Sequence, residues 1–136
     1  MIVRLMLYGA AAVVAASVST SGAVAVPGDR PDFSAVTSVA AAKRLAKTGA
    51  LVPVFVFPVE LGGTDEPMNI VYVPPAIRYT MTKVIGTLRR FTKEGLIDHM
   101  FVEPDYRGAS VVPTALHYHA ASHGKPGSIE PTIKIW

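Results

Sequence analysis

Residues 54–73 read VFVFPVELGGTDEPMNIVYV, in which two β-branched and aromatic runs flank a loop that carries a Gly-Gly pair. Runs of this kind favour strands, so we expect one strand over residues 51–59 and a second, shorter strand over residues 69–73. The first run contains Pro53 and Pro58, which indicate a position at a sheet edge because proline cannot donate to the hydrogen-bond ladder.

A helix is predicted over residues 76–94, directly after the Pro74-Pro75 pair that ends the second strand. Its large apolar side chains recur at helical spacing and therefore form one stripe. The stripe consists of Ile77, Met81, Val84, Ile85, Leu88 and Phe91. Gly95 ends the helix, and we expect the stripe to pack on a sheet.

The segments on either side of this unit complete the predicted fold. An Ala-rich run over residues 35–47 indicates a helix that ends at Gly49. The last third of the chain predicts strands over residues 96–103, 110–121 and 129–136, with turns at 104–108 and 124–127. Within the last strand, Ile133 and Ile135 share one face at period two and are expected to point into the core.

The predicted fold class is therefore α+β. An N-terminal helix precedes a strand–loop–strand–helix unit, and C-terminal antiparallel strands pack on helix 76–94. Residues 34–136 are expected to form a single domain, which is what the length of 136 residues allows.

Residues 1–25 have the pattern of a secretory signal peptide. Arg4 precedes an uncharged apolar block over residues 5–18, and the small-x-small sequence Ala23-Val24-Ala25 suits signal peptidase. Residues 26–33 then form a polar, Pro- and Gly-containing linker. We expect cleavage near Ala25 and a secreted or periplasmic protein without a membrane span in its mature part; the alternative is an uncleaved anchor helix.

Composition excludes several classes of protein. The chain has no Cys, which rules out a disulfide scaffold, a thiolate metal site and a Cys nucleophile. No Walker loop, dinucleotide-binding glycine motif, G-x-S-x-G elbow or H-E-x-x-H motif is present. The net charge of +3 is too small to indicate a dedicated nucleic-acid-binding tail.

The order of strand, Gly-Gly loop, asparagine, strand and helix resembles the ββα core of the HNH or His-Me finger nucleases. That family has a segment of the form D-H-I-x-P-x-x-x-G-G-x-x-x-x-x-N-L. Pro58, Gly62, Gly63, Asn69 and Ile70 match its proline, glycine pair, asparagine and aliphatic residue. The resemblance covers about twenty residues and implies that Asn69 braces the loop.

The same resemblance fails at the residues that carry out the family's chemistry. The Asp-His pair falls on Val54 and Phe55, which can neither accept a proton nor bind a hard cation. The resemblance therefore implies a degenerate scaffold without nuclease activity. The alternative is an unrelated compact loop in which Asp65 or Asn69 bonds local backbone amides.

Histidines cluster in the sequence HYHAASH near the C-terminus. On a strand, His117 and His119 project from one face, and His123 follows beyond the strand end. These three imidazoles are candidate ligands for a divalent metal such as zinc or copper, with Glu103 or His99 as a further ligand. The alternative is an ordinary solvated face. No other cofactor is predicted.

Cations gather on the face of helix 76–94 opposite its apolar stripe. They are Arg78, Arg89, Arg90 and Lys93. Such a face is typical of solvated surface, and it also suits a polyanion such as nucleic acid.

These patterns lead to one preferred function and two alternatives. The preferred function is an exported, non-catalytic binding or accessory protein with an unknown protein partner, on a degenerate nuclease-like scaffold. One alternative is a metal-dependent hydrolase, either a nuclease or a phosphoesterase, that uses His117 and His119. The other is a polyanion-binding module on the basic face of helix 76–94.

Overall fold

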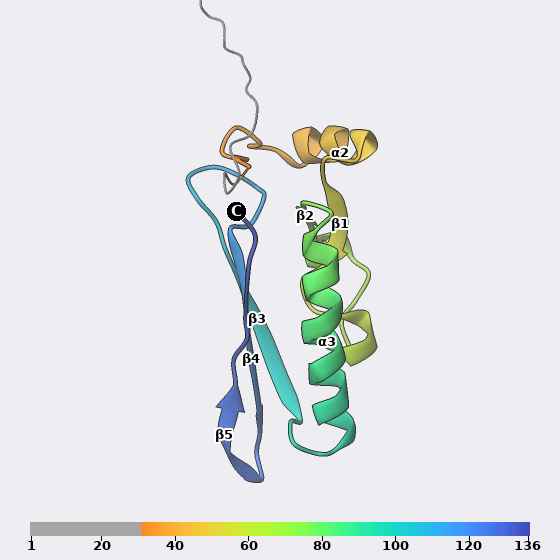
Figure 1. The fold of residues 1–136 in the computed structure, drawn as a ribbon, viewed down its shortest axis with the longest axis vertical. Coiled ribbons are helices and arrows are strands. Elements are labelled where there is room, and N and C mark those ends of the chain that lie inside the picture. The colour runs from red at the N-terminus through yellow and green to blue at the C-terminus, as the bar shows by residue number, and fades with distance from the viewer. Residues whose placement is uncertain (1–30) are drawn as a thin grey trace, which may run out of the picture. The chain divides into compact units, whose positions relative to one another are not determined.

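The computed structural model describes residues 31–136, and residues 32–136 form a compact unit. The predicted signal peptide and residues 26–30 of the predicted linker lie outside the described residues. The described chain has the predicted α+β fold (Figure 1). In chain order its elements are α2 (Val39–Thr48), β1 (Val52–Phe55), β2 (Ile70–Val73), α3 (Ile77–Lys93), β3 (His99–Asp105), β4 (Ala115–Ser122), β5 (Lys125–Ile129) and β6 (Thr132–Lys134).

The strands form two antiparallel sheets. β1 and β2 pair as an isolated hairpin, and two 3-10 turns, Val59–Leu61 and Pro67–Asn69, lie in the loop between them. In the second sheet β4 is central: β3 pairs along one edge, while β5 and β6 pair with successive parts of the other. Figure 1 shows α3 lying alongside this second sheet.

The apolar core joins α3, the inner face of the larger sheet, α2 and the β1–β2 hairpin. Leu116 and Tyr118 of β4 are fully buried, and Met81 and Leu88 of α3 join them in one apolar cluster. The remaining residues of the predicted stripe are partly buried against the same cluster, which confirms the predicted orientation of the helix.

The C-terminus packs into the same core. Ile133 and Ile135 are both buried, as predicted. Trp136 is also buried; its indole N–H donates to the carbonyl of Val112, and its ring meets Phe33 edge to face at 6.0 Å.

Several predicted strand limits are wrong. The turn expected at 104–108 begins only after Asp105, because Pro104 is tolerated in β3, an edge strand. The strand expected over 110–121 begins at Ala115, and residues 106–114 form an irregular segment that contains Pro113.

The C-terminal hairpin also differs from the prediction. Its turn lies at residues 123–124, earlier than the expected 124–127, and β5 starts at Lys125. The single strand expected over 129–136 is replaced by the end of β5 and by β6, with Pro131 between them. Likewise the first strand is shorter than the expected 51–59, because the chain turns into a 3-10 helix after Pro58.

Candidate functional site

All four histidines of the chain lie on the outer face of the larger sheet or next to it. Because side chains alternate along β4, the burial of Leu116 and Tyr118 turns His117 and His119 outward. The β3–β4 register places Glu103 opposite His117 and Phe101 opposite His119. We call this surface the histidine face.

In the middle of the histidine face, His117 and His119 hydrogen-bond to different carboxylates, and Glu103, the predicted further ligand, lies 4.0 Å from His119 Nε2. His117 Nε2 lies 2.7 Å from Asp105 Oδ2, and its Nδ1 lies 2.9 Å from Thr132 Oγ1. His119 Nδ1 lies 2.8 Å from Glu130 Oε1. The hydrogen bond from His119, with a second from Ser128, lowers the pKa of Glu130 below its ordinary value.

The ring of His119 also stacks on Phe101, with ring centroids 4.5 Å apart. His117 therefore uses both ring nitrogens in hydrogen bonds to neighbouring side chains. His119 uses one ring nitrogen in a hydrogen bond, and its ring stacks on Phe101. The two histidines are held in separate hydrogen-bond groups.

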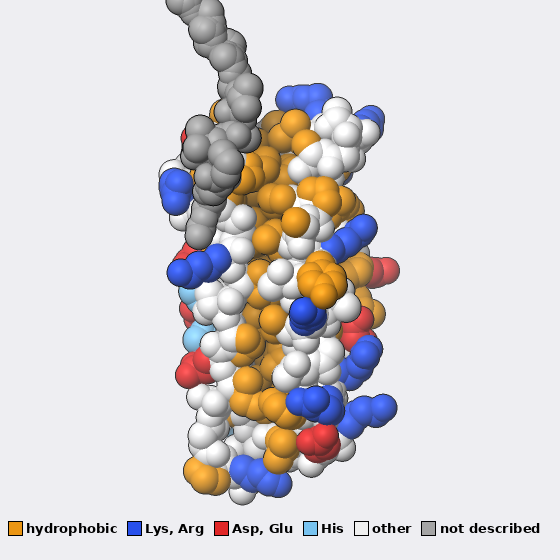
Figure 2. Space-filling model, in the orientation of Figure 1, with side chains coloured by type: hydrophobic (Ala, Val, Ile, Leu, Met, Phe, Trp, Pro, Cys, Tyr) orange, Lys and Arg blue, Asp and Glu red, His pale blue; other side chains and the backbone are white. Residues whose placement is uncertain are grey.

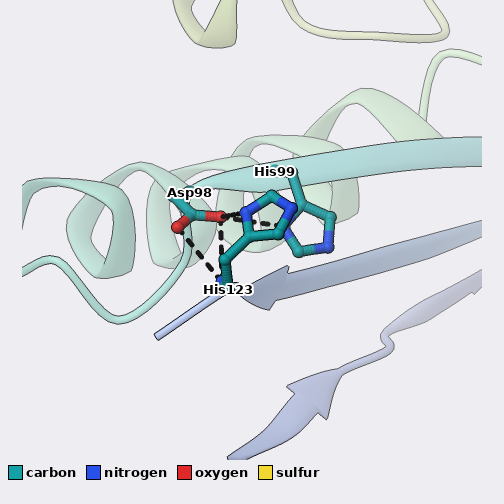
Figure 3. Close-up of side chains that lie close together, drawn as sticks. All are labelled: Asp98, His99 and His123. Atoms are coloured by element: carbon teal, nitrogen blue, oxygen red, sulfur yellow. Dashed lines mark hydrogen bonds and ion pairs between the residues drawn. The ribbon is translucent and has the colours of Figure 1, made fainter. Parts of the chain in front are cut away.

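At the end of the face, two imidazoles share a single carboxylate (Figure 3). His99 Nδ1 lies 2.7 Å and His123 Nδ1 lies 3.0 Å from the same oxygen, Oδ1 of Asp98. The two rings lie with centroids 4.3 Å apart. These contacts, the hydrogen bond from His99 above all, lower the pKa of Asp98 to about 2.

The structure thus places the predicted metal ligands in two groups. His123 lies with Asp98 and His99, whereas His117 and His119 bond to other carboxylates. Within residues 31–136, Asp98, His99 and His123 form the one group of three or more potential ligands whose atoms lie within 4.8 Å of one another. The sequence analysis named His99 as a further ligand but missed Asp98. The available signal was the Asp98-His99 dipeptide at the start of β3.

The loop between β1 and β2 is held by Asn69. Its side-chain oxygen accepts from the Phe57 amide at 2.8 Å, and its amide nitrogen donates to the carbonyls of Phe57 at 2.9 Å and Thr64 at 2.6 Å. A Cβ at Gly63 would lie 2.1 Å from the Phe57 carbonyl oxygen, so no other residue fits there. Gly62 has a φ of 104°, in the left-handed region that favours glycine.

Val54 and Phe55, which stand where the resembled family has Asp-His, lie within β1. Their partners across the hairpin are Val71 and Ile70. Both side chains are partly buried, so this position presents apolar groups to its surroundings.

A groove of about 620 Å³ lies between α2, β2 and the irregular segment after β3. Its walls are mostly apolar, and Lys43 is the one charged side chain among the residues that line it. Three successive residues of β2 line it, together with residues 106 and 108–111 of the irregular segment. The β2 residues are Ile70, Val71 and Tyr72. We call this feature the β2 groove.

The cations predicted to face a polyanion are all exposed on α3. Arg90 forms an ion pair with Glu94 at 3.8 Å and lies over the ring of Phe91. Figure 2 shows that Lys and Arg side chains are spread over both sides of the molecule, whereas the visible histidines lie beside acidic side chains at the left margin of the view.

Comparisons of the chain with protein-family models, with curated proteins and with solved structures found no match. Among the described residues, no helix combines the length and the apolar character needed to cross a membrane.

Proposed function

We propose that this chain is a non-catalytic binding protein that holds an extended peptide segment in the β2 groove. The observation that carries the proposal is the position of β2, a strand of a two-stranded sheet, three successive residues of which line an apolar groove. Addition of a peptide strand to a free sheet edge is a recurrent mode of recognition, in which main-chain hydrogen bonds supply affinity and side-chain pockets supply selectivity.

The hydrogen-bond pattern of the hairpin identifies the backbone groups that are available. The amide of Val56 donates to the carbonyl of Asn69, so residues 69, 71 and 73 bond toward β1. Tyr72, which alternates with them, directs its backbone N–H and C=O away from β1. Within the described residues β2 pairs with no strand other than β1. A bound peptide would pair with Tyr72.

The lining residues define the chemistry of the occupant. The groove volume is in the range of specific ligand sites, and its apolar walls suit alternating apolar side chains of an extended segment. Lys43 supplies a single positive charge, and no carboxylate lies among the lining residues. We therefore expect a peptide that combines apolar residues with one acidic group.

The apolar residues at the position of the resembled family's Asp-His pair support a binding role. We propose that β1, its loop, β2 and α3 form a nuclease-like scaffold whose acid–base pair has been replaced by Val54 and Phe55. The antiparallel hairpin followed by a helix, and the bonds from Asn69 to the loop, support this proposal. Purified protein is expected to leave DNA and RNA intact in magnesium buffer; cleavage that is lost in Asn69→Ala would contradict it.

Peptide binding is tested by selecting a display library of random peptides against the purified chain. The most enriched peptide is then titrated by fluorescence anisotropy. Ala109→Trp, which fills the groove, is expected to weaken binding at least tenfold, while Ala76→Trp, outside the groove, leaves it unchanged. Lys43→Glu is expected to weaken an acidic peptide up to about fivefold, since one exposed ion pair contributes ~0.2–1 kcal/mol.

Two controls make this experiment decisive. Lys47→Glu makes the same charge reversal on the same helix but lies outside the lining residues, so it should leave the affinity unchanged. Hydrogen exchange of the Tyr72 amide should slow when the peptide is bound. Binding that is indifferent to Ala109→Trp, or that leaves exchange at Tyr72 unaltered, would refute strand addition at β2.

We also propose that the protein acts outside the cytoplasm. The support is the signal-peptide pattern of residues 1–25. N-terminal sequencing of the protein from its native cells is expected to begin at Val26, and a chain that retains Met1 in the cytosolic fraction would argue against export.

A further inference from the structure

We infer that Asp98, His99 and His123 bind one divalent transition-metal ion through one carboxylate oxygen and two imidazole nitrogens. This site is distinct from the β2 groove and does not depend on peptide binding.

The distances suit a single ion. Zinc binds imidazole nitrogen and carboxylate oxygen at about 2.0–2.2 Å, so the ligand atoms of a tetrahedral site lie ~3.3 Å apart. In the structure, one ligand atom from each of the three residues lies within 4.8 Å of the others, and the two Nδ1 atoms lie 2.7 and 3.0 Å from Asp98 Oδ1. Small side-chain rotations would open these contacts enough to admit the ion.

The backbone fixes the central ligand before any ion arrives. Asp98 immediately precedes β3, and its amide donates to the carbonyl of Ala121 in β4 at 2.9 Å. The carboxylate of Asp98 in turn accepts from the amide of His123 at 3.1 Å. The pairing of His99 with Ala121 continues this register, so the three residues are brought together by main-chain bonds at the end of β3 and β4.

The other two histidines of the histidine face are arranged differently from His99 and His123. His117 and His119 each bond a separate carboxylate, and His117 uses both ring nitrogens in doing so and in bonding Thr132. Only at the Asp98 end do two imidazoles converge on a single oxygen (Figure 3).

The donor set indicates the class of metal. Two imidazoles favour zinc, copper or nickel over calcium and magnesium, which prefer all-oxygen sites. Three protein ligands leave at least one coordination position for water or another ligand, as in zinc sites that are not purely structural. All three side chains are exposed, so the ion would be in direct contact with solvent.

The inference is tested by titrating the purified chain, prepared without a polyhistidine tag, with Zn²⁺ by calorimetry. We expect one ion per chain. Loss of an outer-shell partner already costs ~10–100-fold in metal affinity, so His99→Ala and His123→Ala should each cost at least about a hundredfold. Asp98→Asn should also weaken binding. It removes the negative charge but keeps an acceptor for the His123 amide, so it distinguishes the effect of the charge from the effect of losing this hydrogen bond.

His117→Ala and His119→Ala are the matched controls, because they remove imidazoles from the same face. They should leave the affinity unchanged, and a melting curve of each variant establishes that it is folded. Substitution by Co²⁺ should give visible absorption that disappears in Asp98→Asn. No binding above that of His99→Ala, or equal losses in His117→Ala and His123→Ala, would overturn the assignment.

Discussion

The two faces of β4 differ completely although they belong to the same strand. Leu116 and Tyr118 on the inner face are fully buried and belong to the apolar cluster that also contains Met81 and Leu88 of α3. His117 and His119 on the outer face are partly exposed and bond carboxylates. The inner face therefore sets stability, whereas the outer face is free to carry ligand chemistry at little cost to the fold.

The largest effect on stability should come from placing a charge in the core beneath the inner face. Leu88 is fully buried in α3, so Leu88→Asp would bury an unpaired carboxylate and leave a gap in the core. The expected loss exceeds ~4 kcal/mol, which is comparable to the whole stability of a small domain. Circular dichroism should show an unfolded chain at room temperature.

The neighbouring Arg89 provides the control, since its side chain is exposed on the same helix. Arg89→Asp should retain a cooperative melting curve close to that of the wild type. If Leu88→Asp also melted like the wild type, the packing of α3 on the sheet would be wrong.

A smaller effect of opposite sign is expected at Tyr118. Its buried hydroxyl has no hydrogen-bond partner among residues 31–136, so Tyr118→Phe should stabilise the protein by about 1 kcal/mol in urea denaturation at neutral pH. Burial also raises the pKa of Tyr118 to about 12, above the value of about 10 in an unfolded chain.

The pKa shift adds a pH signature to this comparison. The folded state keeps the phenolic proton to a higher pH than the unfolded state does, so titration of Tyr118 leaves the stability unchanged below about pH 10 and lowers it as the pH rises toward 12. The stability advantage of Tyr118→Phe over the wild type should therefore increase in urea denaturation at alkaline pH. An advantage that is constant from neutral to alkaline pH would contradict the buried, protonated hydroxyl.

The smallest effect is expected on the outer face. Hydrogen bonds from His119 and Ser128 lower the pKa of Glu130, so the ionised form favours the folded state. This contribution is present above the unfolded pKa of about 4.3 and is lost as pH falls through the lower, folded value. Glu130→Gln should slightly lower the melting temperature near neutral pH and lose its difference from the wild type in acid.

Glu60→Gln is a suitable control, because Glu60 is exposed on the 3-10 turn after β1 and lies outside the histidine face. It should leave the pH dependence of the melting temperature as in the wild type. An identical acid profile for Glu130→Gln and the wild type would show that the His119 contact contributes nothing to folding.

Local periodicity was sufficient for much of the fold. The apolar stripe of α3, the alternation that turns Leu116 inward and His117 outward, and the burial of Ile133 could all be predicted. Each depends on the spacing of side chains within one element, which the sequence states directly. The limits of β3 and β4 could not be predicted, because prolines break strands in some positions and are accepted at sheet edges in others.

The partners of the histidines were decided by tertiary structure alone. Asp98 and His123 are 25 residues apart in the chain, and they meet because β3 pairs with β4 in one particular register. A shift of the register by one residue would give His123 a different carboxylate or none. Sequence thus determined which side chains face outward, while the packing of whole strands, a cooperative property of the folded sheet, determined which of them share a site.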